Sequence, residues 1–437
     1  MTAHTGRVRH AEADKVTTVG FFGILGDGNI GNDASFESVL GYLRDRHPET
    51  VIDAMCAGPE RVRVVYGIDA VPFFYNLTEE KEAPDSKATG TRQPPKASKV
   101  LGRALKVPRI GIETAVTGLR IASWVRRHDV VIVPGMGVLE AALPIRPWTT
   151  PYRLLVLSLS GRIFHTKVAL VCVGANPIHQ RLTRILYVNA ARLASYRSYR
   201  DNFSRDVMRR QGVNVTADHV YPDLAFAIPA ISDEPGYPRT VGIGVMAYYG
   251  SNDQRKQAIS IYETYHETLK LLARQLINTG RSLRLFVGDN NAGDQDVIDD
   301  IVADIRSWRP DLPPERVIAE HSESFADIMA AMAPCSSVIA ARFHNVLCAL
   351  KLAKPTIATG YSTKHRVLMS EMGMEAYCMD IQKLDVDLIV KQIDELERNS
   401  AAIQQTLQER NQIQAKALEQ QFAELTAVLL PSTDWLA

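Results

Sequence analysis

An arginine, a histidine and an asparagine lie together at residues 341–345, where the sequence is ARFHN. The apolar run 338–341 leads into this segment and the apolar run 346–352 follows it, a pattern typical of a buried strand that passes into a helix. At such a point Arg342 could bind a carboxylate or phosphate, and His344 could transfer a proton near neutral pH. The segment predicts an anion-binding acid–base site, although a single histidine is more often a structural hydrogen-bonding residue.

A glycine-rich segment, GDGNIGND at residues 26–33, lies between a strand-like run and a helix-like run. A loop in this position presents backbone N–H groups to an anion or to sugar hydroxyls, and Gly28 and Asn29 are expected to contact substrate. Asp27 or Asp33 could act as a general base. The segment is not a Walker loop, because no Lys-Ser or Lys-Thr follows the glycines. The alternative is that the glycines serve a purely steric role in the turn.

Two further segments combine a short apolar run with residues suited to binding. Gly135 and Gly137 follow the run 130–133 in the sequence PGMG, and glycines at a strand end let a substrate approach the backbone. Taken alone, this pattern is more often a simple turn. Ser362 and Lys364 follow another apolar run and could supply a hydroxyl and a cation to the same cleft, or could belong to a polar loop.

Arg200 follows the strand-like run 193–199. Its guanidinium could bind a phosphate or a carboxylate through two parallel hydrogen bonds. The spacing by itself favours a different interpretation, in which Arg200 pairs with Asp201 or Asp223 at the surface.

The elements that must position these residues alternate between strands and helices. In the first half of the chain, short apolar runs recur at 17–22, 51–55, 130–133, 168–173 and 193–199, separated by helix-length segments. In the second half they recur at 241–246, 283–287, 317–318, 338–341 and 355–358, with helical patterns such as 257–279 between them. This alternation predicts an α/β fold with doubly wound parallel sheets.

The 437 residues are enough for two domains. We predict a polar leader at 1–16, a first Rossmann-like domain at 17–231, a linker at 232–239, a second Rossmann-like domain at 240–384 and C-terminal helices at 385–437. The linker is indicated by closely spaced Pro, Gly and Asp residues. The stretch 78–95 is rich in Glu, Lys, Pro and Gly, and is predicted to be a mobile loop of the first domain.

The composition is that of a soluble globular protein, with 46% hydrophobic and 23% charged residues. A formal net charge of +1 argues against electrostatic attraction of the whole protein to nucleic acid. The five cysteines are widely spaced and are expected to be reduced core thiols. Neither a signal peptide nor a membrane-spanning segment is indicated, so a cytoplasmic location is expected. The scattered histidines predict no metal site.

These stretches, in this order, resemble the polysaccharide pyruvyl transferase family, whose members carry a G-x-G-N-x-G-D-like loop after the first strand. Here the loop has Asn32 inserted before Asp33. The similarity covers roughly residues 19–373 and continues through YGI at 66–68, PGMG at 134–137, VGA at 173–175, YRD at 199–201 with Ser204, YPD at 221–223 and ARFH at 341–344. It implies two Rossmann-like domains that face a cleft, similar to GT-B glycosyltransferases.

The activity implied by the resemblance is transfer of the pyruvyl group of phosphoenolpyruvate to two hydroxyls of one sugar in a polysaccharide, cell-wall polymer or glycolipid precursor, giving a cyclic ketal and phosphate. Arg200 and Arg342 match the family's positions for donor binding, one from each domain. The first domain would hold the acceptor and the second the donor. His344 would protonate the donor's methylene carbon with a pKa raised by the bound anion, and Asp27 or Asp33 would accept the hydroxyl protons. No cofactor and no metal are expected.

A basic amphipathic pattern begins at Lys96 and continues through Lys99, Arg103 and Lys106, with apolar residues on the other side of the helix-like segment. Such a helix can lie on an anionic membrane surface. The pattern motivates the hypothesis that the acceptor is lipid-linked and that the protein contacts the inner face of the membrane. The alternative is a solvated charged face over an ordinary core stripe.

Two other functions fit parts of the sequence. A GT-B-like glycosyltransferase that uses a nucleotide sugar would need a pocket for base and ribose in the second domain, and FVGD at 286–289 could contribute to it. Asp289 could equally cap a helix. A non-catalytic carbohydrate-binding protein could retain the same fold, but the combination of Arg200, Arg342 and His344 argues against loss of activity.

Overall fold

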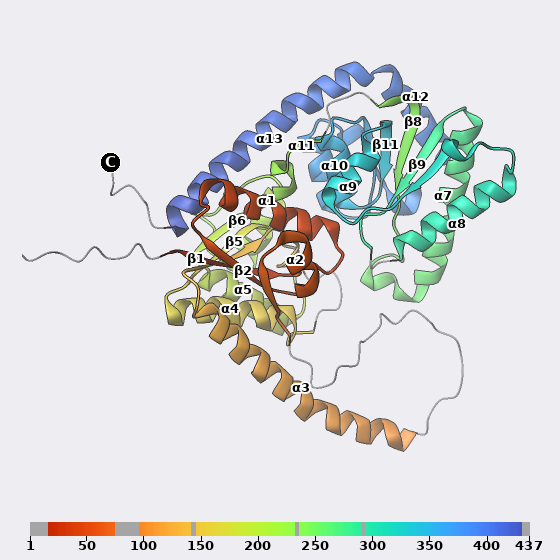
Figure 1. The fold of residues 1–437 in the computed structure, drawn as a ribbon. Helices are drawn as coiled ribbons and strands as arrows, with labels where there is room; N and C mark the ends of the chain where they lie inside the picture. Colours follow the sequence, from red (N-terminus) through yellow and green to blue (C-terminus); the bar gives the residue numbers. More distant parts are fainter. Residues whose placement is uncertain (1–15, 75–95, 141–145, 232–235, 291–292, 431–437) are drawn as a thin grey trace, which may run out of the picture.

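The computed structural model describes residues 16–74, 96–140, 146–231, 236–290 and 293–430, with 96–109 and 252–253 described as backbone only. These residues form two parallel β-sheets, each flanked by helices, and a long C-terminal helix that runs between the two halves (Figure 1). The predicted α/β fold with two Rossmann-like domains is confirmed. The predicted leader and the predicted mobile loop at 78–95 lie outside the described residues, apart from Val16.

The first domain is built on a seven-stranded sheet in the order β3-β2-β1-β4-β5-β6-β7, in which every neighbouring pair is parallel. Its strands are β1 Thr18–Gly23, β2 Val51–Cys56, β3 Asp69–Pro72, β4 Val130–Pro134, β5 Lys167–Val173, β6 Tyr196–Tyr199 and β7 His219–Val220. Its helices are α1 Ile30–Arg46, α2 Pro59–Tyr66, α3 Lys96–Val125, α4 Thr150–Phe164, α5 Arg181–Leu193, α6 Asn202–Arg210 and the short η1 Leu224–Ala227. The strand order reverses between β1 and β4, where parallel sheets bind their ligands.

The second domain repeats this layout with the sheet order β10-β9-β8-β11-β12-β13, again all parallel. Its strands are β8 Tyr237–Gly244, β9 Ser282–Phe286, β10 Val317–Glu320, β11 Cys335–Ala340, β12 Thr356–Gly360 and β13 Cys378–Asp380. Its helices are η2 Asn252–Gln257, α7 Ala258–Asn278, α8 Asp294–Trp308, η3 Pro314–Arg316, α9 Phe325–Met332, α10 Phe343–Lys351, α11 Thr363–Glu371, η4 Glu375–Tyr377 and η5 Ile381–Lys383. The reversal here lies between β8 and β11.

Three strands, β3, β7 and β13, fall outside the apolar runs that predicted strands. Each is an edge strand of four residues or fewer that pairs with one neighbour, so a continuous apolar run is not needed to bury it. The predicted linker at 232–239 also differs, since β8 already begins at Tyr237, whose N–H donates to the carbonyl of Pro334. Gly236 allows this approach, because a Cβ there would overlap the backbone of Cys335.

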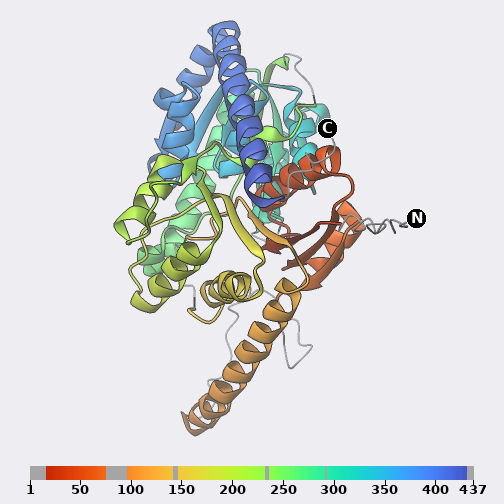
Figure 2. The ribbon, with the colours of Figure 1, turned by 90° about the vertical axis from the view of Figure 1, so that its left-hand side faces the viewer.

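The C-terminal helices belong to different parts of the molecule. Helix α12 Val386–Arg398 packs on the second domain, where the buried Arg281 donates to Asp394 and Glu397. Helix α13 Ser400–Leu429 runs from there across to the first domain (Figures 1 and 2). On the first domain the ring of Phe422 stacks on Tyr42 with centroids 4.7 Å apart. Helix α13 therefore acts as a strap between the two domains.

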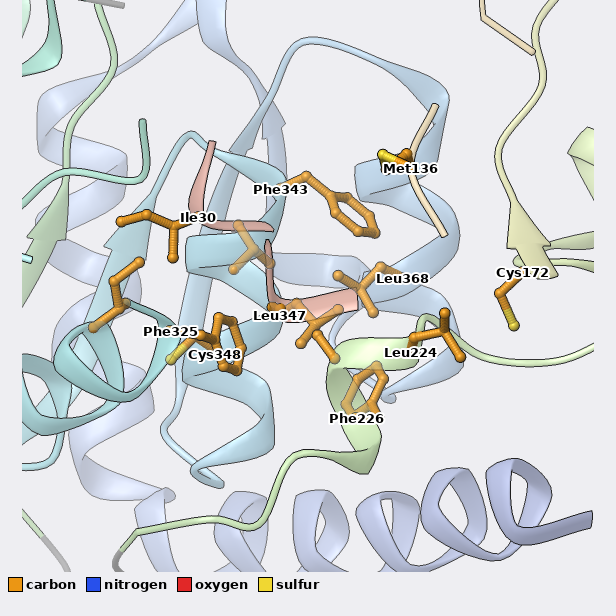
Figure 3. Packing of buried hydrophobic residues seen from close by; sticks show 14 of the residues in the cluster. Ile30, Met136, Cys172, Leu224, Phe226, Phe325, Phe343, Leu347, Cys348 and Leu368 are labelled. Atoms are coloured by element: carbon orange, nitrogen blue, oxygen red, sulfur yellow. The ribbon is translucent and has the colours of Figure 1, made fainter. Parts of the chain in front are cut away.

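The two domains also share a hydrophobic core (Figure 3). Leu224 and Phe226 of η1, in the first domain, lie beside Leu347 of α10 and Leu368 of α11. The Nζ of Lys351 donates to the carbonyl oxygen of Phe226 over 2.7 Å. This packing holds the start of α10, with Arg342 and His344, against the first domain.

None of the described helices has the length and apolar character needed to cross a membrane. The five cysteines all carry free thiols, as the sequence predicted, and four of them are buried.

Candidate active site

The glycine-rich loop joins β1 to α1 and contacts the second domain. Gly26 and Gly28 have positive φ angles of 70° and 95°, which a residue with a Cβ would adopt only with strain. The side chain of Asn29 caps α1 by accepting from the N–H of Asn32 over 3.2 Å. Its amide also donates to Asp289 after β9 over 3.2 Å. The loop thus forms the turn between β1 and α1 and also contacts the second domain.

His344, in the first turn of α10, lies directly on the first turn of α1. A methyl group built on Gly31 would overlap its imidazole ring, so the absence of a side chain at Gly31 makes room for His344. The imidazole Nε2 lies 3.8 Å from Oδ2 of Asp223, just before η1. Three segments that are distant in sequence therefore enclose this histidine.

Arg200, after β6, forms the centre of what we call the Arg200 cluster, composed of Glu140, Arg200, Asp223, His344 and Lys364. Its Nη2 donates to Glu140, which follows β4, and its Nε lies 3.7 Å from Asp201. Its guanidinium carbon lies 5.3 Å from the ring centroid of Phe343, and the Nζ of Lys364 lies 5.4 Å from the same centroid. The cluster therefore brings cations from both domains to one aromatic ring.

The charged residues of the Arg200 cluster shift one another's pKa values. Burial disfavours ionisation of Glu140, but the charges of Lys364 and Arg200 outweigh it and hold the pKa of Glu140 below its usual value. Burial lowers the pKa of His344 to about 4, with Asp223 opposing the fall and Lys364 and Arg200 adding to it. The rise in the pKa of His344 that is expected beside a bound anion stays a prediction.

Arg342 is held by two carboxylates of the second domain. Its Nε and Nη2 each donate over 2.8 Å to the fully buried carboxylate of Asp294, at the start of α8. Its Nη1 lies 3.7 Å from Asp289. The two arginines predicted to bind one donor thus have different carboxylate partners, Glu140 for Arg200 and Asp294 for Arg342.

A family model described as polysaccharide pyruvyl transferase matches residues 29–363, which include the whole Arg200 cluster except Lys364. The chain belongs to the polysaccharide pyruvyl transferase family. No curated protein matches the chain.

Solved structures with the same two-domain GT-B fold span nearly the whole chain at low sequence identity. A UDP-GlcNAc 2-epimerase from Neisseria meningitidis bound to UDP-GlcNAc is 10% identical with a TM-score of 0.56, over 94% of this chain and 100% of that one. A UDP-N-acetylglucosamine 2-epimerase is 11% identical with a TM-score of 0.57, over 95% and 96%. MurG from Acinetobacter baumannii is 12% identical with a TM-score of 0.50, over 94% and 99%. At this identity the likeness shows the fold alone.

In this member of the polysaccharide pyruvyl transferase family, the two aspartates of the glycine-rich loop, Asp27 and Asp33, have different surroundings. Asp33 is buried, and its Oδ1 accepts from the N–H of Gly26 over 2.7 Å, while Oδ2 lies 3.6 Å from Arg61. Asp33 thus links the end of the glycine-rich loop to its beginning at Gly26. Asp27 is only partly buried, and burial together with the charges of Asp33 and Asp289 raises its pKa to about 6 despite a bond from the N–H of Asn29. Asp27 is the better placed of the two to accept a proton.

The other predicted contact residues have local structural roles. Gly135 has φ 55°, and a Cβ there would overlap the hydroxyl of Ser35. A Cβ on Gly137 would crowd the carboxylate of Glu140. The hydroxyl of Ser362 lies 3.1 Å from Nδ1 of His365, at the start of α11. Lys364 alone of this group brings its charge to the Arg200 cluster.

Sequence reasoning missed Glu140 and the importance of Asp223 and Asp294. Glu140 lies three residues beyond the PGMG turn, without a local pattern that marks it. Asp223 lies in the YPD segment quoted for the family resemblance, which is the signal that could have identified it. Within the described ranges, no group of three or more His, Cys, Asp or Glu side chains could hold a metal ion.

The FVGD segment proposed for a nucleotide base has a structural explanation. The ring of Phe286 is fully buried against Gly242 and Gly244. Asp289 does not cap a helix, because α8 begins at Asp294 with Gly293 as its N-cap. Instead Asp289 joins Asn29 of the first domain to Arg342 of the second.

Proposed function

We propose that the protein transfers the pyruvyl group of phosphoenolpyruvate to two hydroxyls of one sugar in a polysaccharide or glycolipid precursor, and forms a cyclic ketal. The observation that carries the proposal is the Arg200 cluster, in which cations from both domains and a proton-transferring group meet at the start of α10. This arrangement suits a small donor with a phosphate and a carboxylate.

Two helix N-termini add to the attraction for the donor. The N-cap residue of α10 is Arg342, whose side chain is held by Asp294, and the N-cap of α11 is Ser362, whose hydroxyl is beside His365. Neither side chain occupies the first-turn N–H groups of its own helix, so these amides can bind an anion together with the helix dipole. Among the described residues, no carboxylate lies within ion-pair distance of Lys364, so its ammonium group can form a direct contact with the donor.

The reaction follows from these positions. A proton passes from His344 to the methylene carbon of the donor and leaves a cation at the carbon that bears the phosphate. The first sugar hydroxyl attacks that carbon, with Asp27 as our candidate for its proton. Phosphate then departs with the electron pair of its C–O bond, and the second hydroxyl closes the ring and loses its proton. One donor and one diol give one ketal and one phosphate.

Removal of Lys364 should distinguish this donor from a nucleotide sugar. In calorimetric titration without metal, we expect phosphoenolpyruvate to bind the wild type, and Lys364→Met to weaken binding by about tenfold or more, as loss of one charge-assisted contact does. Arg366→Met is the matched control, because it removes a cation from the exposed part of the same helix and should leave affinity unchanged. Binding of a UDP-sugar panel with no response to phosphoenolpyruvate would contradict the proposal and favour the glycosyltransferase.

We further propose that the first domain rests on an anionic membrane surface through what we call the α4–α5 face. Leu159, Ile163 and Phe164 of α4, and Leu182 and Ile185 of α5, are exposed apolar residues on two helices that pack together. Neither helix contains Asp or Glu, while Arg162, Arg181 and Arg184 lie among the apolar residues. Apolar and basic side chains without carboxylates match an anionic lipid surface. The basic side chains predicted for this role at 96–106 lie outside those described.

Vesicle sedimentation tests this face. The double variant Ile163→Glu, Ile185→Glu should bind phosphatidylglycerol vesicles more weakly than the wild type by more than about tenfold, because it removes two insertable side chains and adds negative charge. Ile259→Glu is the control, since Ile259 is 71% exposed on α7 of the second domain. Equal sedimentation of the wild type and the double variant would refute the membrane contact.

A further inference from the structure

A cavity in the first domain adjoins the Arg200 cluster and holds polar groups that the reaction so far does not use. It has a volume of about 210 Å³ and lies beyond the carboxyl ends of β1 and β4, between the glycine loop and helices α4 and α5. Its walls are mostly apolar, with Phe22, Phe73 and Met136 among them. This is smaller than the roughly 300–1,000 Å³ of pockets for drug-sized ligands, and it suits one sugar ring.

Arg153 of α4 brings a partly buried positive charge into this cavity. Its guanidinium carbon lies 4.5 Å from the ring centroid of Phe73, and its Nε is buried without a hydrogen-bond partner. No carboxylate of the described residues forms an ion pair with it. Burial accordingly lowers the pKa of Arg153 to about 10. A partly buried charge without a counterion costs stability, so an anion bound beside Arg153 would be favoured.

Tyr187 of α5 supplies a second polar group. Its side chain is fully buried and lines the cavity, and its hydroxyl has no hydrogen-bond partner. The Tyr187 hydroxyl and the Arg153 Nε both lack a hydrogen-bond partner, and in a mostly apolar chamber they can bind one negatively charged group together.

Glu140 connects this cavity to the chemistry. Its carboxylate accepts from Arg200, and the same residue lines the cavity wall. Asn32, from the first turn of α1 next to Gly31, also lines the cavity. A sugar held by Arg153 would therefore have hydroxyls near Glu140 and near the loop that carries Asp27.

We infer that this cavity is the acceptor subsite and that it selects an anionic sugar, with Arg153 and Tyr187 binding its carboxylate or phosphate group. The inference rests on the proposed function and adds the chemical class of the acceptor. A uronic acid and a sugar phosphate share this chemistry, so the test must separate them.

The test uses calorimetry on the full chain with matched pairs of sugars: glucose with glucuronate and with glucose 1-phosphate, galactose with galacturonate, mannose with mannose 1-phosphate, and N-acetylglucosamine with its 1-phosphate. We expect the charged member of at least one pair to bind at least about tenfold more tightly than the neutral one, the effect of one charge-assisted hydrogen bond. The pairs that respond identify the anion as carboxylate or phosphate.

The variants assign the preference to this cavity. Arg153→Met should abolish the preference for the charged sugar, Arg153→Lys should retain part of it, and Tyr187→Phe should reduce it while removing only the hydroxyl. Thermal melts establish that each variant is folded, and Tyr187→Phe keeps the test decisive if Arg153→Met does not fold. Failure of all charged sugars to bind better than their neutral partners, or a preference unchanged in Arg153→Met and Tyr187→Phe, would overturn the inference. Binding of phosphoenolpyruvate, measured in parallel, should be unchanged in all variants. The proposal for the donor is therefore tested independently of the inference about the acceptor.

Discussion

Replacement of His344 by Gln should lower the turnover number by about 10²–10⁴-fold, the usual contribution of a positioned general acid. His344 is enclosed by Gly31, Asp223 and the cations of the Arg200 cluster, so a glutamine can fill its space but cannot deliver a proton to carbon. Donor affinity, measured by calorimetry, should change much less than turnover. A variant with wild-type turnover would remove His344 from the mechanism.

The protonation of His344 can be followed directly. Burial lowers its pKa to about 4, so the imidazole is uncharged at neutral pH. A bound phosphate and carboxylate should offset Lys364 and Arg200 and raise this pKa. At a pH between the pKa of His344 without the donor and its higher pKa with the donor, donor binding takes up a proton. The affinity for the donor therefore falls as the pH rises through the higher of these two pKa values.

Calorimetry in two buffers of different ionisation enthalpy measures this uptake. The wild type should take up more protons per bound donor than His344→Gln. Subtracting the uptake of the variant from that of the wild type removes the contribution of the donor's own ionisation. Asp223→Asn provides a second check, because an amide oxygen can still accept from the N–H of Ala225 while the charge that raises the pKa of His344 is lost. As the pH is raised, the activity of Asp223→Asn should be lost at a lower pH than the activity of the wild type. Equal proton uptake by the wild type and His344→Gln would contradict the role of acid.

Gly31→Ala should lower activity by about 10²-fold, because a displacement of about 1 Å in a reacting group costs that much. The added methyl group would occupy the space of the His344 ring, so either the imidazole moves or the domain boundary opens. The helix itself should tolerate the change, since Ala favours a helix over Gly by about 1 kcal/mol.

Gly41→Ala is the matched control in the same helix. Nothing lies within 4 Å of a Cβ built on Gly41, so this variant should keep full activity and gain a little thermal stability. Steady-state rates and thermal melts of the two variants separate the effect on His344 from the effect on α1. Full activity in Gly31→Ala would show that the close packing of His344 on α1 is not needed for catalysis.

Much of the architecture could be predicted from the order of apolar runs. Strands such as β4 and β5 are buried on both faces, so their sequences are almost continuously apolar and easily found. Because all strands of a parallel sheet end at one edge, residues that follow neighbouring strands of the same sheet, such as His344 after β11 and Lys364 after β12, could be expected to lie close together. The edge strands β3, β7 and β13 could not be found this way, since each is paired and buried on one side only.

The sequence by itself determined the fold class, the family and the residue types at the strand ends. The tertiary structure alone decided which of these residues act together. Arg200 pairs with Glu140, 60 residues away, and Arg342 with Asp294, 48 residues away, so the two predicted donor-binding arginines belong to separate networks. The low pKa of His344 likewise arises from burial beside cations that come from distant segments. Hydrogen bonds and charge interactions depend on distance in space, and local sequence patterns carry no information about those partners.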